Sequence, residues 1–278
     1  MKKTSPSASF VGEVEAYMRP FEGTFAYEVV KNGHLDNSRF YSICQTIATY
    51  KPIAGSVILS SGCGSAGDLA VCLELGAKEC YGIEVDEGLY KLASVRFKHS
   101  PYENQVDLRH YHGKELPYPG QKFDLIMSMH VIEHVQDAEL YMRELFRVLS
   151  PRGVLFLELP NRYYWQEQHT LLPLIHIPPN PWRNRLIKIL LSPLFRHWLG
   201  QANRQKLTAM LDLLHPTPSA LMSYFRRYES EYQLKLVEAC FYAWDQPPIS
   251  YSELTSLGSL MHLRQMPTFR LVISKIAI

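Results

Sequence analysis

The stretch that decides the fold runs from residue 56 to residue 67 and reads Ser-Val-Ile-Leu-Ser-Ser-Gly-Cys-Gly-Ser-Ala-Gly. Its first half is a short apolar run typical of a buried strand, and its second half is a glycine-rich loop. The apolar residues 69–75 predict a helix that ends at Gly76. A strand, a glycine loop and a helix in this order are typical of the first unit of a ligand-binding α/β fold.

The alternation of strands and helices continues for about another 90 residues. Further strands are predicted at 81–85, 106–111, 123–129 and 154–159, and helices at 89–97 and after Asp137. The strands are apolar on both faces, which predicts a parallel sheet covered by helices on both sides. We therefore expect a doubly wound, Rossmann-like α/β fold whose ligand lies at the carboxyl ends of the strands.

The rest of the chain is predicted to extend this core. Residues 226–278 would complete a seven-stranded, mostly parallel sheet, with a helix at 229–241 and strands at 241–245 and 269–276. The four expected segments are a tail (1 to about 10) with helices including 38–50 in 1–54, the ligand-binding core in 55–160, a helical cap inserted after the fifth strand in 161–225, and the completion of the sheet in 226–278.

Composition excludes several classes of protein. Of the 278 residues, 46% are hydrophobic and 20% charged, which excludes a mainly disordered chain. A net charge of +2 argues against a nucleic-acid partner, and no apolar run is long enough for a membrane span. The basic start is not followed by the apolar core of a secretory signal. Five cysteines without a Cys-x-x-Cys pair predict neither a zinc site nor a disulfide framework, and a reduced cytoplasmic location fits best.

The glycine loop and an acid on the next strand suggest what is bound. The loop glycines permit a tight turn and a close approach of the backbone to a ligand. Glu84 ends the next strand, where a carboxylate can accept both hydrogen bonds of a ribose diol. The loop fits the pyrophosphate of a dinucleotide or the amino-acid end of S-adenosylmethionine. Asp68 favours the second ligand, because an acid in the first turn of the helix would repel a pyrophosphate.

A linked set of motifs separates these classes better. It comprises Leu-Pro-Tyr at 116–118, Phe-Asp-Leu-Ile at 123–126, Ile-Glu-His-Val at 132–135 and Arg-Val-Leu-Ser-Pro at 147–151. With the glycine loop and Glu84, this set resembles the class I S-adenosylmethionine-dependent methyltransferases over about residues 55–162, with a weaker echo at 229–276. Within that family the sequence is similar to the small-molecule O-methyltransferases of ubiquinone biosynthesis.

The resemblance implies a set of cofactor-binding positions, in which the loop contacts the methionine half, Glu84 the ribose, strand three's end the adenine and strand four's end the sulfonium. The implied residues are Ser60, Gly62, Cys63, Gly64, Gly67, Glu84, Val85, His112, Gly113, Met129 and His130. Two of them depart from the family, which usually has an acid at the place of Ser60 and often one at the place of His112. An inactive relative that only binds its ligand therefore stays open.

Two clusters could take a proton from a hydroxyl nucleophile, a step that needs a general base or a metal. His130, Glu133 and His134 resemble the Glu-x-x-Glu-His run of the ubiquinone enzymes, which can hold a divalent metal. Because His130 replaces the first glutamate, we expect no metal here. His169, after the fifth strand, is a second candidate base, since histidine titrates near neutral pH, although a structural role is equally open. His176 lies among apolar residues and is expected in the core.

The predicted cap is basic and apolar. Between Gln168 and Leu211 there are six Lys or Arg residues and no Asp or Glu. Such a stretch suits an interfacial segment at an anionic membrane, a lid over the substrate, or a helical subdomain with a solvated basic face. Residues 182–206 are the candidate for peripheral membrane contact, although prolines exclude a single long helix.

The sequence therefore predicts an S-adenosylmethionine-dependent methyltransferase that methylates a hydroxyl of a small-molecule, glycan or lipid-linked acceptor. We expect it in the cytoplasm, with membrane association as an option and the oligomeric state open. The alternatives are an NAD(P)-dependent oxidoreductase, favoured by the Gly-x-Gly-x-x-Gly pattern at 62–67, and an inactive methyltransferase-like binding protein.

Overall fold

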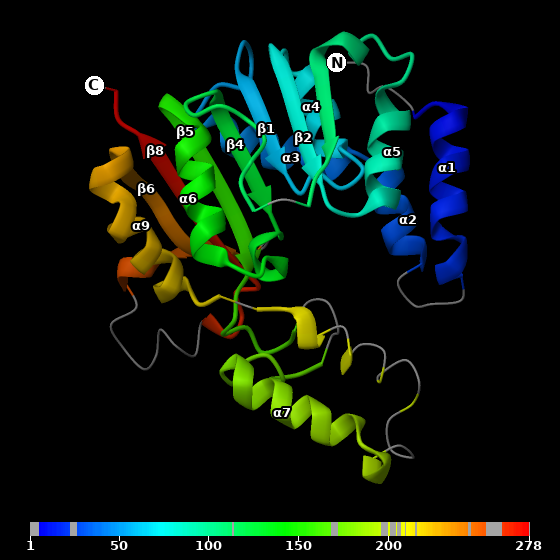
Figure 1. The fold of residues 1–278 in the computed structure, drawn as a ribbon, viewed down its shortest axis with the longest axis vertical. Helices are drawn as coiled ribbons and strands as arrows, with labels where there is room; N and C mark the ends of the chain where they lie inside the picture. Colours follow the sequence, from blue (N-terminus) through cyan, green and yellow to red (C-terminus); the bar gives the residue numbers. More distant parts are fainter. Residues whose placement is uncertain are drawn as a thin grey trace. The chain divides into compact units, whose positions relative to one another are not determined.

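The computed structural model contains a sheet with eight strands within the residues that it describes. The described residues are 6–22, 27–112, 114–167, 172–195, 200, 204, 207–208, 210–214, 216–243, 246–253 and 263–277. Hydrogen bonds order the strands β3-β2-β1-β4-β5-β8-β6-β7 (Figure 1). The chain divides into two compact units, one of residues 1–128, 147–155 and 277–278, the other of residues 129–146 and 156–276.

The predicted alternation of strands and helices is confirmed. β1 (Val57–Ser61), β2 (Glu79–Glu84), β3 (Val106–His110) and β4 (Phe123–Met129) pair in parallel. The connecting helices include α4 (Gly67–Glu74) and α5 (Glu87–Phe97), and α6 (Ala138–Val148) leads into β5 (Leu149–Pro160). Ile58 and Leu59 are fully buried, as expected for a strand covered on both faces. The fold class is thus the doubly wound α/β fold.

Three helices precede β1 in the first unit: α1 (Ala8–Met18), α2 (Tyr27–Leu35) and α3 (Ser38–Ala48). α1 packs against α2 and α5, as Figure 1 shows, around a core that includes Phe10, Val14 and Leu92. The prediction of a tail up to about residue 10 is wrong. Ser7 caps α1 by accepting from the Phe10 amide, and the buried Phe10 ring anchors the helix.

The second unit differs from prediction near its C-terminal end. α9 (Pro218–Tyr232) is followed by β6 (Leu234–Ala243), which pairs antiparallel with β7 (Gln246–Ser250) and β8 (Thr268–Lys275). The helix predicted at 229–241 is therefore wrong, because Gln233 turns into the left-handed region and ends α9 there. The strand expected at 269–276 is confirmed as β8, and β7 raises the strand number from seven to eight.

The insertion after β5 contains α7 (Asn180–Leu191). Ile187 of α7 packs with Leu207, Met210 and Leu213 in a small core of its own. Short 3-10 turns in the two units are η1 (Arg19–Phe21), η2 (Glu103–Gln105), η3 (Ile132–His134), η4 (Pro193–Phe195), η5 (Met210–Asp212) and η6 (Tyr251–Glu253). The four segment boundaries expected from the sequence stay predictions.

Candidate cofactor site

The glycine loop between β1 and α4 has the backbone that its glycines predict. Gly62, Gly64 and Ala66 all have positive φ angles, of 72°, 54° and 56°. A side chain at Gly64 would meet no atom within 4 Å, so this residue faces open space where a ligand can approach. Gly67 is glycine for another reason, because a Cβ there would lie 2.7 Å from the Asn37 side chain next to α3.

The amides of this loop are bonded within the protein. Gly62 and Cys63 donate their N–H groups to the carbonyl of Ile83, at 2.9 and 3.0 Å. The Gly64 amide donates to Glu84 Oε2 at 2.8 Å. The loop is therefore joined to the end of β2 before any ligand binds, and a ligand contacting Gly62 or Cys63 would meet their backbone without using these amides.

Glu84 is a buried carboxylate that receives three backbone donors. Besides Gly64, the amides of Val85 and Asp86 donate to its Oε1 at 2.8 and 3.0 Å. An ionised carboxylate has about four lone-pair sites, so Glu84 can still accept a hydroxyl. One acceptor position is left for a ligand, and the three backbone bonds make Glu84 a structural brace for the loop.

Ser60 is bonded to an acid that comes from the next helix. Its hydroxyl donates to Asp68 Oδ2 at 2.6 Å, and Asp68 Oδ1 accepts from the Leu69 amide at 2.8 Å. Both residues are buried, and burial raises the pKa of Asp68. The resembled family usually has an acid at the position of Ser60. In this chain a carboxylate, that of Asp68 at the N-terminus of α4, is hydrogen-bonded to Ser60. Its charge would stabilise a cation at the loop and repel a pyrophosphate.

A half-buried arginine supports the loop from outside. Arg96 of α5 donates to the Ser65 carbonyl at 2.5 Å, to the His34 carbonyl at 2.7 Å and to Asn37 Oδ1 at 3.2 Å. The His34 ring lies 3.0 Å from Ser65 Oγ, and burial, with Arg96 and Arg39 nearby, lowers the pKa of His34 to about 4. Sequence reasoning missed these residues because they lie far from the loop along the chain and belong to no motif.

An aromatic row lies past the ends of β2 and β3. The ring of His110 stacks on Tyr90 with centroids 5.6 Å apart and contacts His112 edge-on at 4.2 Å. His110 Nε2 lies 3.0 Å from the carbonyl of Val85, whose side chain is exposed. His112 follows β3 as predicted, and Gly113 lies outside the described residues. Tyr90 and His110 add flat ring surfaces that the sequence did not single out.

The second unit contains the residues after β4. His130 has a φ of 56°, an uncommon value for a side-chain-bearing residue, and its amide donates to the Glu158 carbonyl at 2.8 Å. His130 Nδ1 lies 3.7 Å from Oε1 of the buried Glu133. The Glu133 carbonyl in turn accepts from the Leu214 amide at 2.8 Å. The half-buried Met129 ends β4, where the sequence placed it.

The remaining candidate bases and thiols are placed as follows. His134 is exposed, His176 is buried as expected, and His169 lies outside the described residues. Burial raises the pKa of the Cys63 thiol well above its usual value, so Cys63 is a packing residue rather than a thiolate. Within the described ranges, no group of three or more His, Cys, Asp or Glu side chains is arranged to hold a metal ion.

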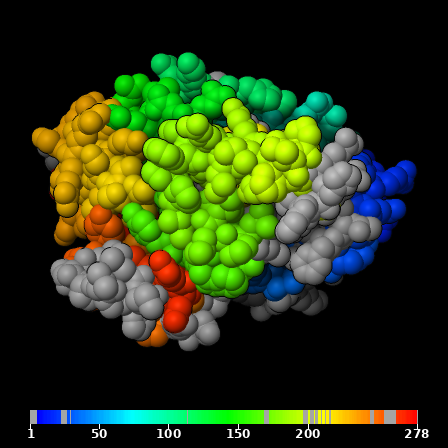
Figure 2. Space-filling model, turned by 90° about the horizontal axis from the view of Figure 1, so that it is seen from below, coloured from blue at the N-terminus to red at the C-terminus, as the bar shows by residue number. Residues whose placement is uncertain are grey.

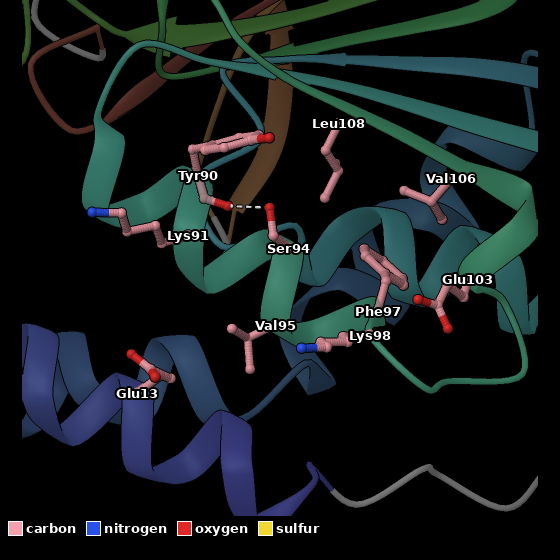
Figure 3. A pocket seen from close by; sticks show the side chains of 10 residues that line it. All are labelled: Glu13, Tyr90, Lys91, Ser94, Val95, Phe97, Lys98, Glu103, Val106 and Leu108. Atoms are coloured by element: carbon pink, nitrogen blue, oxygen red, sulfur yellow. Dashed lines mark hydrogen bonds between the residues drawn. The ribbon is translucent and has the colours of Figure 1, made fainter.

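An open groove on the first unit shares Tyr90 with the aromatic row, and its other lining residues are not among the candidate site residues. It has a volume of about 570 Å³, and its walls come from α1, α5, η2 and β3, with Tyr90, Val95 and Phe97 among the lining side chains (Figure 3). In Figure 3, Ser94 Oγ bonds the Tyr90 carbonyl, a contact within α5. None of the site residues predicted from the sequence lines the groove, so the candidate site rests on the loop and its carboxylates.

Comparison with known proteins agrees with this geometry. Residues 59–157 match a family model described as a methyltransferase domain. This stretch is therefore similar to a methyltransferase domain. A probable S-adenosylmethionine-dependent methyltransferase of Mycolicibacterium smegmatis is 33% identical over 132 residues, which is 48% of this chain and 46% of that protein. A ubiquinone biosynthesis O-methyltransferase of Ruegeria pomeroyi is 33% identical over 116 residues, 42% of this chain and 46% of its own.

The fold also resembles that of solved structures. The crystal structure of an S-adenosylmethionine-dependent methyltransferase from Mesorhizobium loti aligns with a TM-score of 0.53 and 14% identity, over 83% of this chain and 96% of that one. This likeness shows the fold. The chain spans about half the length of the curated relatives it matches. The name of the Mycolicibacterium smegmatis relative contains the cofactor that the sequence predicts for this chain, S-adenosylmethionine.

Proposed function

We propose that the protein transfers a methyl group from S-adenosylmethionine to a hydroxyl of a small-molecule, glycan or lipid-linked acceptor. One observation carries the choice of donor: two buried carboxylates, Asp68 and Glu84, lie at the glycine loop. A ligand whose amino-acid end presents an ammonium to Asp68 and whose ribose presents a hydroxyl to Glu84 is complementary to them. A dinucleotide would bring a pyrophosphate to the same acids, where like charges repel.

Each group around the loop has a proposed role. Asp68, bonded to Ser60, would hold the ammonium of the cofactor, and Glu84 would accept one ribose hydroxyl. The rings of His110 and His112 offer stacking surfaces for adenine. Gly64 leaves room for the methionine portion. When bound, S-adenosylmethionine supplies an electrophilic methyl group, so the protein's main task is to align the acceptor with it.

The proposed base is His130. Its Nδ1 lies 3.7 Å from Oε1 of the buried Glu133, which is longer than a hydrogen bond, so the carboxylate would act through its charge and stabilise the imidazolium that forms when Nε2 accepts the proton of a hydroxyl. His134 is exposed, and we assign it no role in proton transfer. Names of similar proteins such as the ubiquinone O-methyltransferase support oxygen as the methylated atom.

Ligand binding is the first test of this proposal. S-Adenosylhomocysteine at about 100 times its dissociation constant should add roughly 2.7 kcal/mol to the free energy of unfolding, a rise in Tm of about 5–10 °C. NAD at the same concentration should leave the Tm unchanged. A shift with NAD alone would favour the oxidoreductase alternative and contradict the assignment of Asp68.

Methyl transfer is tested separately. Labelled S-adenosylmethionine is offered with phenol, sugar and polyprenyl-phenol acceptors, each paired with an analogue that carries an amine in place of the hydroxyl. Label on the hydroxyl compounds supports the proposal, and label on the amines alone overturns oxygen as the acceptor atom. Binding without transfer to any acceptor would favour the inactive binding protein.

A further inference from the structure

The helix α7 has one buried and one exposed face. On the buried face, Arg183 and Ile187 are fully covered, and Ile187 packs with Leu207, Met210 and Leu213. The Arg183 guanidinium donates to the Leu213 carbonyl and to Asn184 Oδ1. The helix is therefore fixed in its unit by this face, and its other face is turned outward.

The outer face is unusually apolar. Trp182 is 69% exposed and Leu194, in η4, is 86% exposed, with Leu186, Ile189 and Phe195 exposed beside them. These are five of the twelve exposed large hydrophobic side chains found among the described residues. Figure 2 shows the yellow-green atoms of this segment uncovered on the face in view. A cluster of this kind marks a contact surface, whereas single exposed apolar residues need no explanation.

The charge on this face has one sign. Arg185 and Lys188 are exposed, and they border an open hollow of about 680 Å³ that Ile189 and Leu194 also line. The sequence has no Asp or Glu between residues 168 and 211. Arg183 is buried, and Arg204 donates to the Leu191 carbonyl, so Arg185 and Lys188 supply the outward charge within the described part of α7.

We propose that this outer face of α7 and η4 binds the surface of a lipid bilayer that contains anionic phospholipids. Trp182, Leu186, Ile189, Leu194 and Phe195 would enter the interface while Arg185 and Lys188 contact the phosphates. A second copy of the same basic face would be repelled, which favours an anionic surface as the occupant. Among the described helices none is long and apolar enough to cross a membrane, and the contact is peripheral.

The test is sedimentation of the full chain with vesicles. We expect binding to phosphatidylcholine vesicles that contain phosphatidylglycerol, weaker binding in high salt, and little binding to phosphatidylcholine alone. R185Q/K188Q should bind the anionic vesicles about 30-fold less tightly, at about 1 kcal/mol for each charge. Trp182→Ser should also weaken binding to the anionic vesicles. The contribution of Trp182 to the tryptophan fluorescence of the vesicle-bound protein should be lost in this variant.

A matched control removes the same charge elsewhere in the same unit. Arg226 and Lys235 are exposed on α9 and β6, and R226Q/K235Q should bind vesicles as the unaltered protein does. Equal loss in both double variants, or equal binding to neutral and anionic vesicles, would overturn the proposal. The proposal would also be overturned if the unaltered protein self-associates in the absence of lipid and Trp182→Ser abolishes this self-association. The Tm of each variant shows that a loss of binding is not a loss of folding.

Discussion

At the scale of single residues, Asp68 is proposed to bind the ligand, and its buried charge also destabilises the folded protein. Its carboxylate is buried at the start of α4, with the Ser60 hydroxyl and the Leu69 amide as donors. Burial raises its pKa, which means that the folded state favours the neutral acid more than the unfolded state does. Ionisation of Asp68 at neutral pH therefore lowers the free energy of unfolding, and a bound cation would offset this cost.

Asp68→Asn should accordingly separate folding from binding. The asparagine Oδ1 can keep the bond from Leu69, so we expect a higher Tm for the ligand-free protein at pH 7 and a loss of this gain as the acid range is approached. S-Adenosylhomocysteine should bind about 10- to 100-fold more weakly, the loss of about 1–3 kcal/mol typical of a bond to a charged group. Calorimetric titration measures it, and Ser60→Ala is the matched control.

An analogue of S-adenosylhomocysteine without the amino group sharpens this experiment. If Asp68 holds the ammonium, the variant and the unaltered protein should bind that analogue equally well. A variant that loses affinity for both compounds by the same factor would mean that Asp68 only shapes the loop.

At the scale of elements, Arg96 and His34 tie α5 and α2 to the glycine loop. His34 is held neutral in the folded state, with a pKa lowered to about 4 by burial and by the nearby Arg96 and Arg39. Between about pH 6.5 and 4 the unfolded chain therefore binds more protons at this residue than the folded protein does. The free energy of unfolding should fall as the pH is lowered through this window.

His34→Gln should flatten that pH dependence, because glutamine has no proton to gain. We expect the unaltered protein to lose about 1–2 kcal/mol more than the variant from pH 7 to pH 4.5, a value reduced for the partial exposure of His34. Urea unfolding at several pH values measures the difference. Parallel curves for the two proteins would show that His34 is not the titrating group.

The elements also show where sequence patterns were sufficient. Strands β1, β2 and β4 and the second half of β5 were predictable because each is a mainly apolar run between turn signals, and β3 because its apolar and polar residues alternate. The secondary structure of the region after Tyr228 could not be predicted in this way. Leu234, Leu236 and Phe241 fit a helical period as well as a strand, and the residue that ends α9 is Gln233, whose left-handed turn no sequence rule marks.

The parts of the candidate site whose contacts join residues close together in the sequence could be predicted, and the parts whose contacts join distant residues could not. Glu84 and Gly64 follow from a motif within one βα unit and meet at 2.8 Å. The Ser60–Asp68 bond spans only eight residues, yet the sequence pattern indicated only a missing acid at Ser60, because the carboxylate that we propose in its place comes from the helix instead of the strand. Arg96 is 31 residues from Ser65 in the sequence, and its hydrogen bond to the Ser65 carbonyl is visible only in the folded chain.

At the scale of the whole molecule, the insertion after β5 is built into the second unit. The Asn161 side chain donates to the carbonyls of Leu263 and Met266, and its amide donates to that of Pro267. The Leu214 amide donates to the Glu133 carbonyl. These bonds join the start and the end of the insertion to the same unit that contains β6 and β8, so the segment is not a detachable cap.

Hydrogen exchange should show this integration. We expect the amides of Asn161 and Leu214 to exchange with the same opening free energy as Leu271 and Val272 in the centre of β8. Exposed residues at the N-terminus of α7, such as Trp182, provide a fast-exchanging reference. Opening of Leu214 at a free energy several kcal/mol below that of β8 would show that the insertion unfolds separately.

The internal hydrogen bonds of the glycine loop have a kinetic consequence. Because Gly62, Cys63 and Gly64 donate to Ile83 and Glu84, the loop has its final shape while empty. A ligand that binds then causes little further ordering of the backbone. The loop therefore loses less conformational entropy on binding than a flexible loop would. Binding at the loop becomes a simple bimolecular encounter and release a simple dissociation, so exchange of one ligand molecule for another needs no slow rearrangement of this segment.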